Sequence, residues 1–180
     1  MANGVIDIRR YSFRPDDRLF LDSNIWLSVC GPVAFVDWRT EVYSAALRDI
    51  EIEKCQVFID VLVFSEYINR FSRFEYEQLN PAVKPTKYRD FRDSTSYVPV
   101  AEEIAANARK ILRRSTCCDS GFDSIDIHKL LSEYETGSSD FNDQIIIELC
   151  KAKDLKLVTH DGDFRDCGLF VITANKKLTI

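Results

Sequence analysis

The sequence predicts an α/β fold, a three-layer sandwich in which helices flank a central, mostly parallel sheet of four or five strands. Short runs of Val, Ile, Leu and Phe recur along the chain, which is typical of strands buried on both faces. Amphipathic segments separate these runs, as they do in βαβ units. At 180 residues the chain can build one substantial core, so we expect a single domain over residues 1–180.

Four segments are predicted to form the strands at the centre of this sheet. Each is short and apolar, and polar turn residues bound each of them. The predicted strands are residues 18–21, 56–59, 155–159 and 169–172.

Helical spacing of apolar residues predicts the connections. Residues 38–54 and 61–71 are expected to be helices, the second with Glu66 near its start. Residues 100–114 form a third predicted helix, whose basic last turn suits the helix dipole. A fourth begins near Asp140, with the turn at residues 137–139 expected to supply its N-cap.

The middle of the chain is less regular. Residues 80–99 contain three prolines and are predicted to be a loop or lid rather than a regular element. Residues 115–123 break regularity, and residues 124–135 fit a short strand or a helix equally well. We therefore expect an expanded helical and loop region at about residues 72–136.

Composition excludes some classes of protein. A net charge of −5 argues against a protein that coats nucleic acid through its overall charge. No secretory signal and no apolar run of about 18 residues is visible, so we expect a cytoplasmic protein without a membrane partner. The six cysteines form no metal-binding spacing and are expected to be reduced thiols.

Acidic residues follow two of the predicted strands. Asp22 follows the first strand, and Asp161 and Asp163 follow the third. Ligands of open α/β sheets gather outside the carboxyl ends of the strands, so these residues can converge on one site. Glu66 faces roughly the same end, and Asp140 and Asp143 lie at i and i+3 on one helix face.

These acidic residues are candidates for a metal site. The candidate ligands are Asp22, Glu66, Asp140, Asp143, Asp161 and Asp163, with neutral oxygen donors at Ser23, Asn24, Asn142 and Thr159. Oxygen ligands suit Mg²⁺, or Mn²⁺, and without a cation the carboxylates would repel one another. A bound ion that activates water would make phosphodiester hydrolysis the most accessible chemistry.

At these residues the sequence resembles the PIN-domain ribonucleases, a family that includes the VapC-type toxins of bacterial toxin-antitoxin pairs. Four segments carry the resemblance: FLDSNIW at 20–26, SEY at 65–67, DFNDQII at 140–146 and VTHDGDF at 158–164. The resemblance covers both ends of the chain, and residues 72–136 lie largely outside it.

The resemblance implies a metal-dependent endoribonuclease that hydrolyses RNA. Its acidic quartet would be Asp22, Glu66, Asp143 and Asp161, with Asp140, Asp163 and Asn24 as auxiliary residues. It also implies an antitoxin protein as a partner of a toxin, and a homodimer. The alternative is a non-catalytic RNA- or protein-binding module of the same fold. A haloacid-dehalogenase-type phosphatase is disfavoured, because Asn24 stands where that class needs a second aspartate.

Several of these residues also have structural interpretations. Asp22 could cap a helix, although the ordered pattern favours a metal ligand, with Ser23 and Asn24 as the capping residues. Asp140 could complement the helix dipole, so Asp143 is the better candidate ligand. His160 is expected to have a structural or substrate-contact role.

Basic and aromatic residues alternate in the segment after Glu66. They could follow a single-stranded backbone and stack on bases, or they could belong to a solvated helix and loop. The basic positions are Arg70, Arg73, Lys84, Lys87, Arg89 and Arg92, and the aromatic ones Phe71, Phe74, Tyr76, Tyr88 and Phe91.

Overall fold

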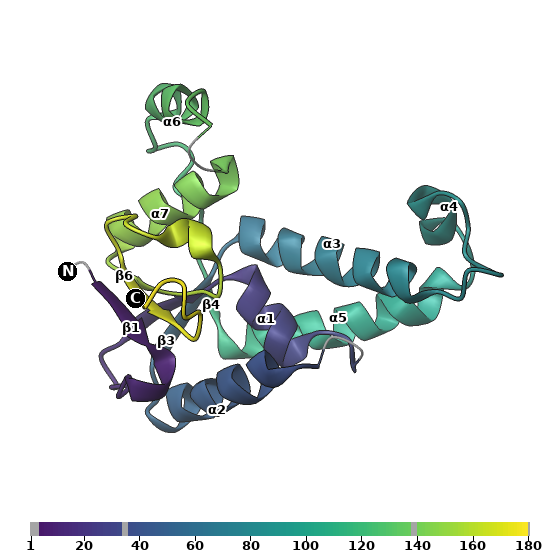
Figure 1. Ribbon diagram of the computed structural model, residues 1–180, viewed down its shortest axis with the longest axis horizontal. Helices are drawn as coiled ribbons and strands as arrows, with labels where there is room; N and C mark the ends of the chain where they lie inside the picture. Colours follow the sequence, from purple (N-terminus) through teal and green to yellow (C-terminus); the bar gives the residue numbers. More distant parts are fainter. Residues whose placement is uncertain (1–3, 34–35, 138–139, 180) are drawn as a thin grey trace.

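A computed structural model describes residues 4–33, 36–137 and 140–179. One six-stranded sheet in the order β1-β6-β5-β2-β3-β4 forms its centre, and every pairing in the sheet is parallel. Because parallel crossovers are right-handed, the connections on the two sides of β2 cover opposite faces. Figure 1 shows α7 on one side of the sheet and α1 and α2 on the other, which confirms the predicted three-layer α/β fold.

All four predicted strands are present. They are β2 (Arg18–Leu21), β3 (Gln56–Ile59), β5 (Lys156–Val158) and β6 (Phe170–Thr173). The ends of β5 and β6 differ by one residue from the prediction. Two short edge strands, β1 (Gly4–Asp7) and β4 (Thr116–Cys117), extend the sheet to six strands.

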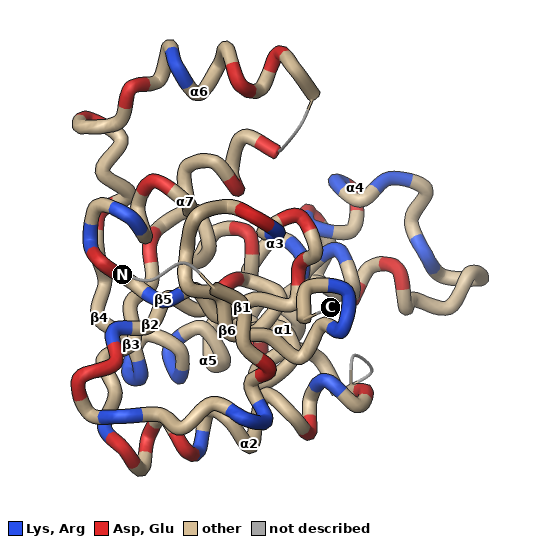
Figure 2. Tube along the Cα trace, turned by 60° about the vertical axis from the view of Figure 1, so that its left-hand side comes forward, with Lys and Arg blue, Asp and Glu red and all other residues tan. Residues whose placement is uncertain are grey.

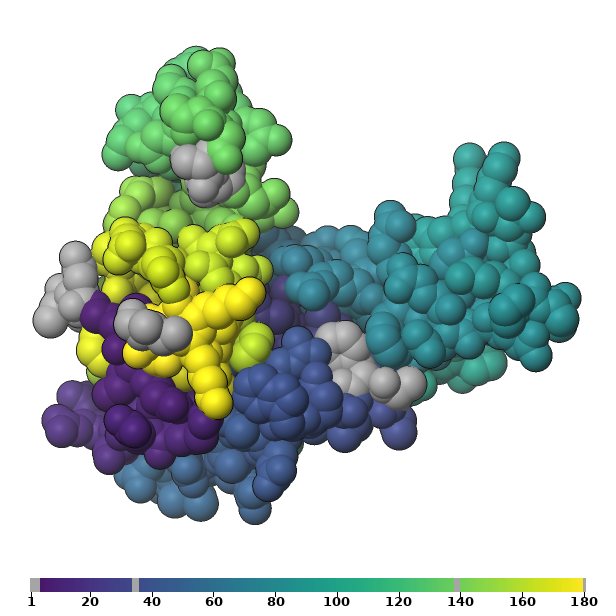
Figure 3. Space-filling model, viewed as in Figure 1, coloured from purple at the N-terminus to yellow at the C-terminus, as the bar shows by residue number. Residues whose placement is uncertain are grey.

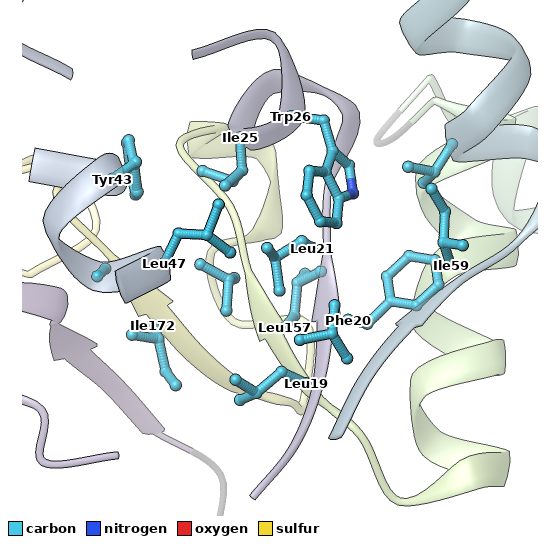
Figure 4. Close-up of a cluster of buried hydrophobic side chains, with 14 of the residues drawn as sticks. Leu19, Phe20, Leu21, Ile25, Trp26, Tyr43, Leu47, Ile59, Leu157 and Ile172 are labelled. Carbon is cyan, nitrogen blue, oxygen red and sulfur yellow. The ribbon is translucent and has the colours of Figure 1, made fainter. Parts of the chain in front are cut away.

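The core lies between the central strands and the helices that cover them. Leu19, Phe20 and Leu21 of β2 are almost fully buried, as apolar strands covered on both faces must be. Figure 4 shows Trp26 and Tyr43 reaching this cluster from the helices. Each side chain of this size stabilises the fold by about 1.5–3 kcal/mol relative to exposure.

The first three helices follow the apolar spacing of the sequence. α1 (Ser23–Cys30) starts directly after β2, and α2 (Trp38–Ile52) confirms the helix predicted over residues 38–54. α3 (Val61–Gln78) begins as predicted but continues beyond residue 71.

Residues 80–99 are not entirely irregular, so the prediction of a loop was wrong in part. α4 (Tyr88–Arg92) lies inside this segment, and α5 (Tyr97–Arg114) begins before Pro99. Proline is tolerated there because the N–H groups of the first helical turn have no intrahelical acceptor. In Figure 1, α3 and α5 run side by side away from the sheet and carry α4 at their far end. We call α3, α4 and α5 the arm.

The remaining helices lie between β4 and β5. α6 (Ile127–Tyr134) shows that the helical alternative for residues 124–135 was correct, and α7 (Phe141–Lys153) follows it. Ser138 and Ser139 of the predicted N-cap lie outside the described residues. The N-cap of α7 is Asp140, whose carboxylate accepts a hydrogen bond from the backbone N–H of Asn142 at 2.8 Å.

Two short 3₁₀ helices complete the described structure, η1 (Ile8–Arg10) and η3 (Gly162–Phe164). All six cysteine thiols are free, as expected. No helix of the described residues is both long and apolar enough to cross a lipid bilayer.

Candidate active site

Asp22 stands at the carboxyl end of β2, near the centre of the sheet. Its backbone N–H donates to the carbonyl of Val158 at 3.0 Å, which joins the ends of β2 and β5. Asp22 is the N-cap residue of α1, but its side chain makes no capping hydrogen bond. Asp60 holds the equivalent place after β3, and there the carboxylate caps α3 through the N–H of Val63 at 2.9 Å. The carboxylate of Asp22 is therefore buried without being used as a cap.

Two side chains hold the Asp22 carboxylate in place. The Thr159 hydroxyl donates to Oδ2 of Asp22 at 2.7 Å, and the Asn24 amide donates to the same oxygen at 2.6 Å. The Asn24 amide also donates to the Thr159 hydroxyl oxygen at 3.2 Å. The expectation that Asn24 serves as a cap was wrong: its amide orients the carboxylate two residues before it.

The same two side chains link Asp22 to Asp161. Oδ1 of Asn24 accepts the backbone N–H of His160 at 3.0 Å, and the hydroxyl oxygen of Thr159 accepts that of Asp161, also at 3.0 Å. Asp161 caps η3 by accepting the N–H of Asp163 at 3.1 Å. The backbone of Asp161 is thus fixed by the side chains that hold Asp22, whereas the side chains of both Asp161 and Asp163 are exposed.

Glu66 approaches from the second turn of α3 and is half-buried. Its carboxylate pairs with Nη1 of Arg70 at 3.3 Å, one helical turn further along. Nη1 of Arg70 also lies 3.4 Å from the Ser23 hydroxyl at the start of α1. A guanidinium therefore stands at the edge of the acidic site.

Asp143 lies in the first turn of α7 and is half-buried, whereas the capping residue Asp140 is exposed. The turn that begins α7 thus presents Asp143 to the site and uses Asp140 to satisfy the helix N-terminus. This difference agrees with the preference for Asp143 over Asp140 as a ligand.

Repulsion between the carboxylates is visible in their pKa values. Burial raises the pKa of Asp22 to about 6, and the charges of Glu66 and Asp161 act in the same direction against the Thr159 hydrogen bond. Burial likewise raises the pKa of Asp143 to about 7, helped by the charges of Asp161 and Asp22. Each of Asp22, Glu66, Asp143 and Asp161 therefore lies within electrostatic range of at least one of the others, although they come from four separate segments.

The donors of this cluster suit a hard cation. Each residue of the acidic quartet offers carboxylate oxygens, and burial together with neighbouring carboxylates raises the pKa of Asp22 and Asp143. Across residues 4–33, 36–137 and 140–179, however, no three His, Cys, Asp or Glu side chains stand close enough together to ligate one ion as they are placed. The carboxylates influence one another's pKa, but their oxygens do not converge on one position.

His160 has the structural surroundings that the sequence favoured. Its Nδ1 lies 2.8 Å from the Tyr43 hydroxyl, and its ring meets those of Tyr43 and Trp38 edge to face. Burial lowers the pKa of His160, and the nearby charge of Arg39 adds to this effect. A neutral imidazole in this position braces the loop that carries Asp161.

A hollow of about 290 Å³ borders the site along α3. Its lining residues are Leu27, Arg70, Arg73, Phe74 and Glu77. Arg70 lines this hollow and also contacts Ser23 and Glu66, so it connects the hollow to the acidic cluster.

Most of the basic and aromatic residues that could have contacted RNA pack against one another within the arm. Phe71 and Phe91 are fully buried, so neither ring can stack on a base. Tyr76 and Tyr88 pack against each other and against Phe91, with ring centroids 5.5–6.5 Å apart. Arg73 lies over the ring of Tyr88, and Lys84 over that of Tyr76. These contacts favour the structural alternative for this segment.

Sequence reasoning missed one exposed aromatic residue beside the site. Trp38 opens α2, and 54% of its surface is exposed although its ring touches that of His160. Its apolar spacing with the rest of α2 suggested only a helix start. Its contact with His160 depends on the position of the loop after β5, which local spacing does not reveal.

Comparisons with known proteins concern the family and the fold of the chain. The PIN domain family matches residues 19–168, which include all six predicted carboxylates. The comparison with curated proteins found no match. Among solved structures, a chain of VapBC2 from Rickettsia felis bound to a DNA fragment from their promoter is similar in fold, with a TM-score of 0.51. The two are 14% identical, and the likeness covers 86% of this chain and 97% of the other. The chain therefore belongs to the PIN domain family, as the four motifs of its sequence predicted.

Proposed function

We propose that this protein is a metal-dependent endoribonuclease that hydrolyses phosphodiester bonds of RNA. The observation that carries this proposal is the buried Asp22 carboxylate at the carboxyl end of β2, which Thr159 and Asn24 orient and tie to the loop that carries Asp161. Membership of the PIN domain family, whose members are generally nucleases, supports it.

Mg²⁺ or Mn²⁺ is the proposed cofactor. Asp22, Asp143 and Asp161 would hold the ion, Glu66 would complete the shell, and Asp140 and Asp163 would lie at its margin. A cation of this class, when bound, lowers the pKa of a water molecule and stabilises the leaving oxygen in phosphodiester hydrolysis.

The chain's own residues prepare the site for that chemistry. Asn24 and Thr159 hold the Asp22 carboxylate in one orientation. Asp22 therefore loses little conformational entropy when substrate binds. Arg70 places a guanidinium beside Ser23 and Glu66, where it can bind a phosphate of the substrate. Burial of Asp22 beneath α1 excludes bulk water from one side of the cluster.

We further propose that the protein acts in the cytoplasm as a VapC-type toxin that an antitoxin protein holds inactive. The Rickettsia felis structure, which contains VapBC2, supports this at the level of the fold. Expression of the wild-type chain alone should then arrest growth, while expression of Asp143→Asn should not. A homodimer is a further expectation, which the elution volume of the pure protein would test.

Cleavage of a labelled single-stranded RNA in Mg²⁺, in Mn²⁺ and in EDTA tests the enzymatic function. We expect the wild-type chain to cleave only with metal. Asp22→Asn and Asp143→Asn should lose more than the roughly 10–100-fold that removal of an outer partner costs. Glu102→Gln, which neutralises an exposed carboxylate on α5, is the matched control and should cleave normally.

Two results would contradict the proposal. One is no cleavage by the wild-type chain with either metal, and the other is undiminished cleavage by Asp143→Asn. RNA binding that ignores both chelator and Asp22→Asn would instead indicate a non-catalytic binding module.

A further inference from the structure

Trp38 offers an exposed aromatic surface at the edge of the acidic cluster. The two tryptophans of the chain differ sharply: Trp26 is fully buried in the core, whereas 54% of Trp38 is exposed. Leaving so large an apolar ring in water forgoes the stabilisation that burial would give. Such a residue beside a candidate active site points to a ligand that covers it.

The indole is held firmly although it is exposed. Its ring centroid lies 5.4 Å from that of His160 in an edge-to-face contact. His160 is itself fixed, because its ring bonds to the Tyr43 hydroxyl and its backbone N–H to Asn24. Asp37 and Thr40 form a capping box that sets the start of α2, where Trp38 is the first residue. A ring supported in this way loses little conformational freedom when a ligand stacks on it.

Trp38 contacts the loop that carries Asp161 through the ring of His160. His160 directly precedes Asp161, and successive Cα atoms are only about 3.8 Å apart. Asn24, which holds the backbone of His160, also holds the Asp22 carboxylate. A nucleotide next to a phosphate at the cluster would therefore bring its base close to the indole.

The charges around Trp38 are of both signs, since its two neighbours in the chain, Asp37 and Arg39, pair with each other. The amide of Asn175 donates to the carbonyl of His160 at 2.8 Å, which brings the exposed Lys176 and Lys177 into this neighbourhood. The whole chain nevertheless carries a net charge of −5, so long-range attraction for RNA is weak. Affinity for a polyanion must then come largely from contacts that do not depend on charge, and base stacking is the main one.

We propose that Trp38 stacks on the base of a nucleotide that flanks the scissile phosphate of single-stranded RNA. This inference rests on the proposed endoribonuclease function and names a subsite for its substrate. Because every base has an aromatic face, the subsite accepts any sequence and fixes position rather than identity. Unlike Phe71 and Phe91 of the arm, which are buried, Trp38 has an exposed ring on which a base can stack.

Binding of a labelled single-stranded oligoadenylate tests the subsite without turnover. The protein carries Asp143→Asn to prevent cleavage, and Trp38→Ala, Trp38→Phe and Ile52→Ala are each added to it. Ile52 is the matched control, because it is 72% exposed and lies at the opposite end of the same helix. Trp38→Ala should weaken binding roughly tenfold, Trp38→Phe should restore most of the affinity, and Ile52→Ala should change nothing.

Intrinsic fluorescence gives a second reading on the same proteins. RNA should quench tryptophan emission when Trp38 is present, and the quenching should vanish in Trp38→Phe, where only the buried Trp26 remains. In the cleaving protein, Trp38→Ala should raise KM more than it lowers kcat.

The inference is overturned if Trp38→Ala binds RNA as tightly as Ile52→Ala does, in which case Trp38 faces another ligand such as a protein. It is also overturned if Trp38→Phe binds as weakly as Trp38→Ala while both keep the wild-type circular dichroism spectrum. Failure of the proposed function is a separate result: the wild-type chain with Mg²⁺ or Mn²⁺ would not cleave RNA, whatever the binding experiment shows.

Discussion

At the scale of single residues, Thr159 contributes more to the site than its neutral side chain suggests. Its hydroxyl donates to Asp22 and accepts the N–H of Asp161, so one oxygen aligns two proposed ligands from different strand ends. The residue is fully buried, which leaves no water to replace either bond.

Replacing Thr159 with Val should therefore weaken both folding and catalysis. We expect the free energy of unfolding to fall by about 1–3 kcal/mol, because two polar groups lose a buried partner. RNA cleavage should fall by roughly 10–100-fold, because Asp22 loses its alignment. Urea denaturation and a cleavage assay measure the two effects.

Ser72→Ala is the control for Thr159→Val. Ser72 is also buried and bonds to two tyrosine hydroxyls, but it lies on α3 within the arm. This variant should lose stability and keep its cleavage rate. Equal loss of cleavage in both variants would show that lower stability, not alignment, explains the effect.

Asp143 should make the metal-free protein less stable as pH rises. Its pKa is about 7 in the folded chain and ordinarily 3.8, so between these values the unfolded chain ionises first. Stability is therefore fully present below about pH 4 and is lost as pH rises toward 7. Above pH 7, the free energy of unfolding of Asp143→Asn should exceed that of wild type by about 1–2 kcal/mol. This is less than the full pKa shift would give at about 1.4 kcal/mol per pH unit, because Asp143 is only half-buried and solvent screens its charge.

Melting temperatures measured in EDTA across this pH range check the prediction. Asp143→Asn and wild type should converge below pH 4, whereas the exposed Glu102→Gln should follow wild type throughout. A constant difference between Asp143→Asn and wild type at every pH would contradict the assigned titration.

At the scale of elements, Asp140 illustrates how capping and ligation compete for one carboxylate. Asp140→Ala should destabilise the protein by about 1 kcal/mol, because the first turn of α7 loses its cap. Asp140→Ser keeps a capping oxygen and removes the charge, so it should retain both stability and RNA cleavage. Thermal unfolding and cleavage of the two variants separate the roles, and loss of cleavage in Asp140→Ser would assign Asp140 to the metal.

Local pattern predicted some elements well and others not at all. β2 and β3 have the predicted ends, because central parallel strands are apolar throughout and stand out in the sequence. β1 and β4 were missed, because edge strands have exposed residues and no such run. α4 was missed because its Phe91 packs against Tyr76 of α3 and Tyr97 of α5, contacts that the local sequence of α4 does not reveal.

The candidate site shows the same division. Asp22 and Asp161 could be found because they directly follow apolar strands, and Asp143 because it shares a helix face with Asp140. The contacts of Asn24 and Thr159 could not be found, because they depend on β2 and β5 being neighbours in the sheet.

At the scale of the whole molecule, the arm and α6 project in different directions and leave an open angle between them. Figure 3 shows this hollowed face between the green α6 region and the teal arm. Figure 2 shows Lys and Arg distributed over α2, α4, α6 and the C-terminal residues rather than gathered on one surface. The angle is therefore open, and the basic residues are spread over several elements of the molecule.

Metal binding should stabilise the whole fold. An ion that binds only the folded chain adds about 2.7 kcal/mol when its concentration is 100 times Kd. Adding Mg²⁺ should thus raise the melting temperature of wild type and of Glu102→Gln, and EDTA should reverse the change. Asp22→Asn should show a much smaller rise, and an equal rise in Asp22→Asn would place the ion elsewhere.

The strand order has a consequence for how the protein is made. β5 lies between β6 and β2, so the middle of the sheet stays open until residues 156–158 have left the ribosome. Contacts between such distant segments form late, since the chain must close a long loop to make them. Asp22 then has no Asp161 beside it while the chain is still being translated. The residues of the candidate site can therefore come together only after most of the chain has been synthesised.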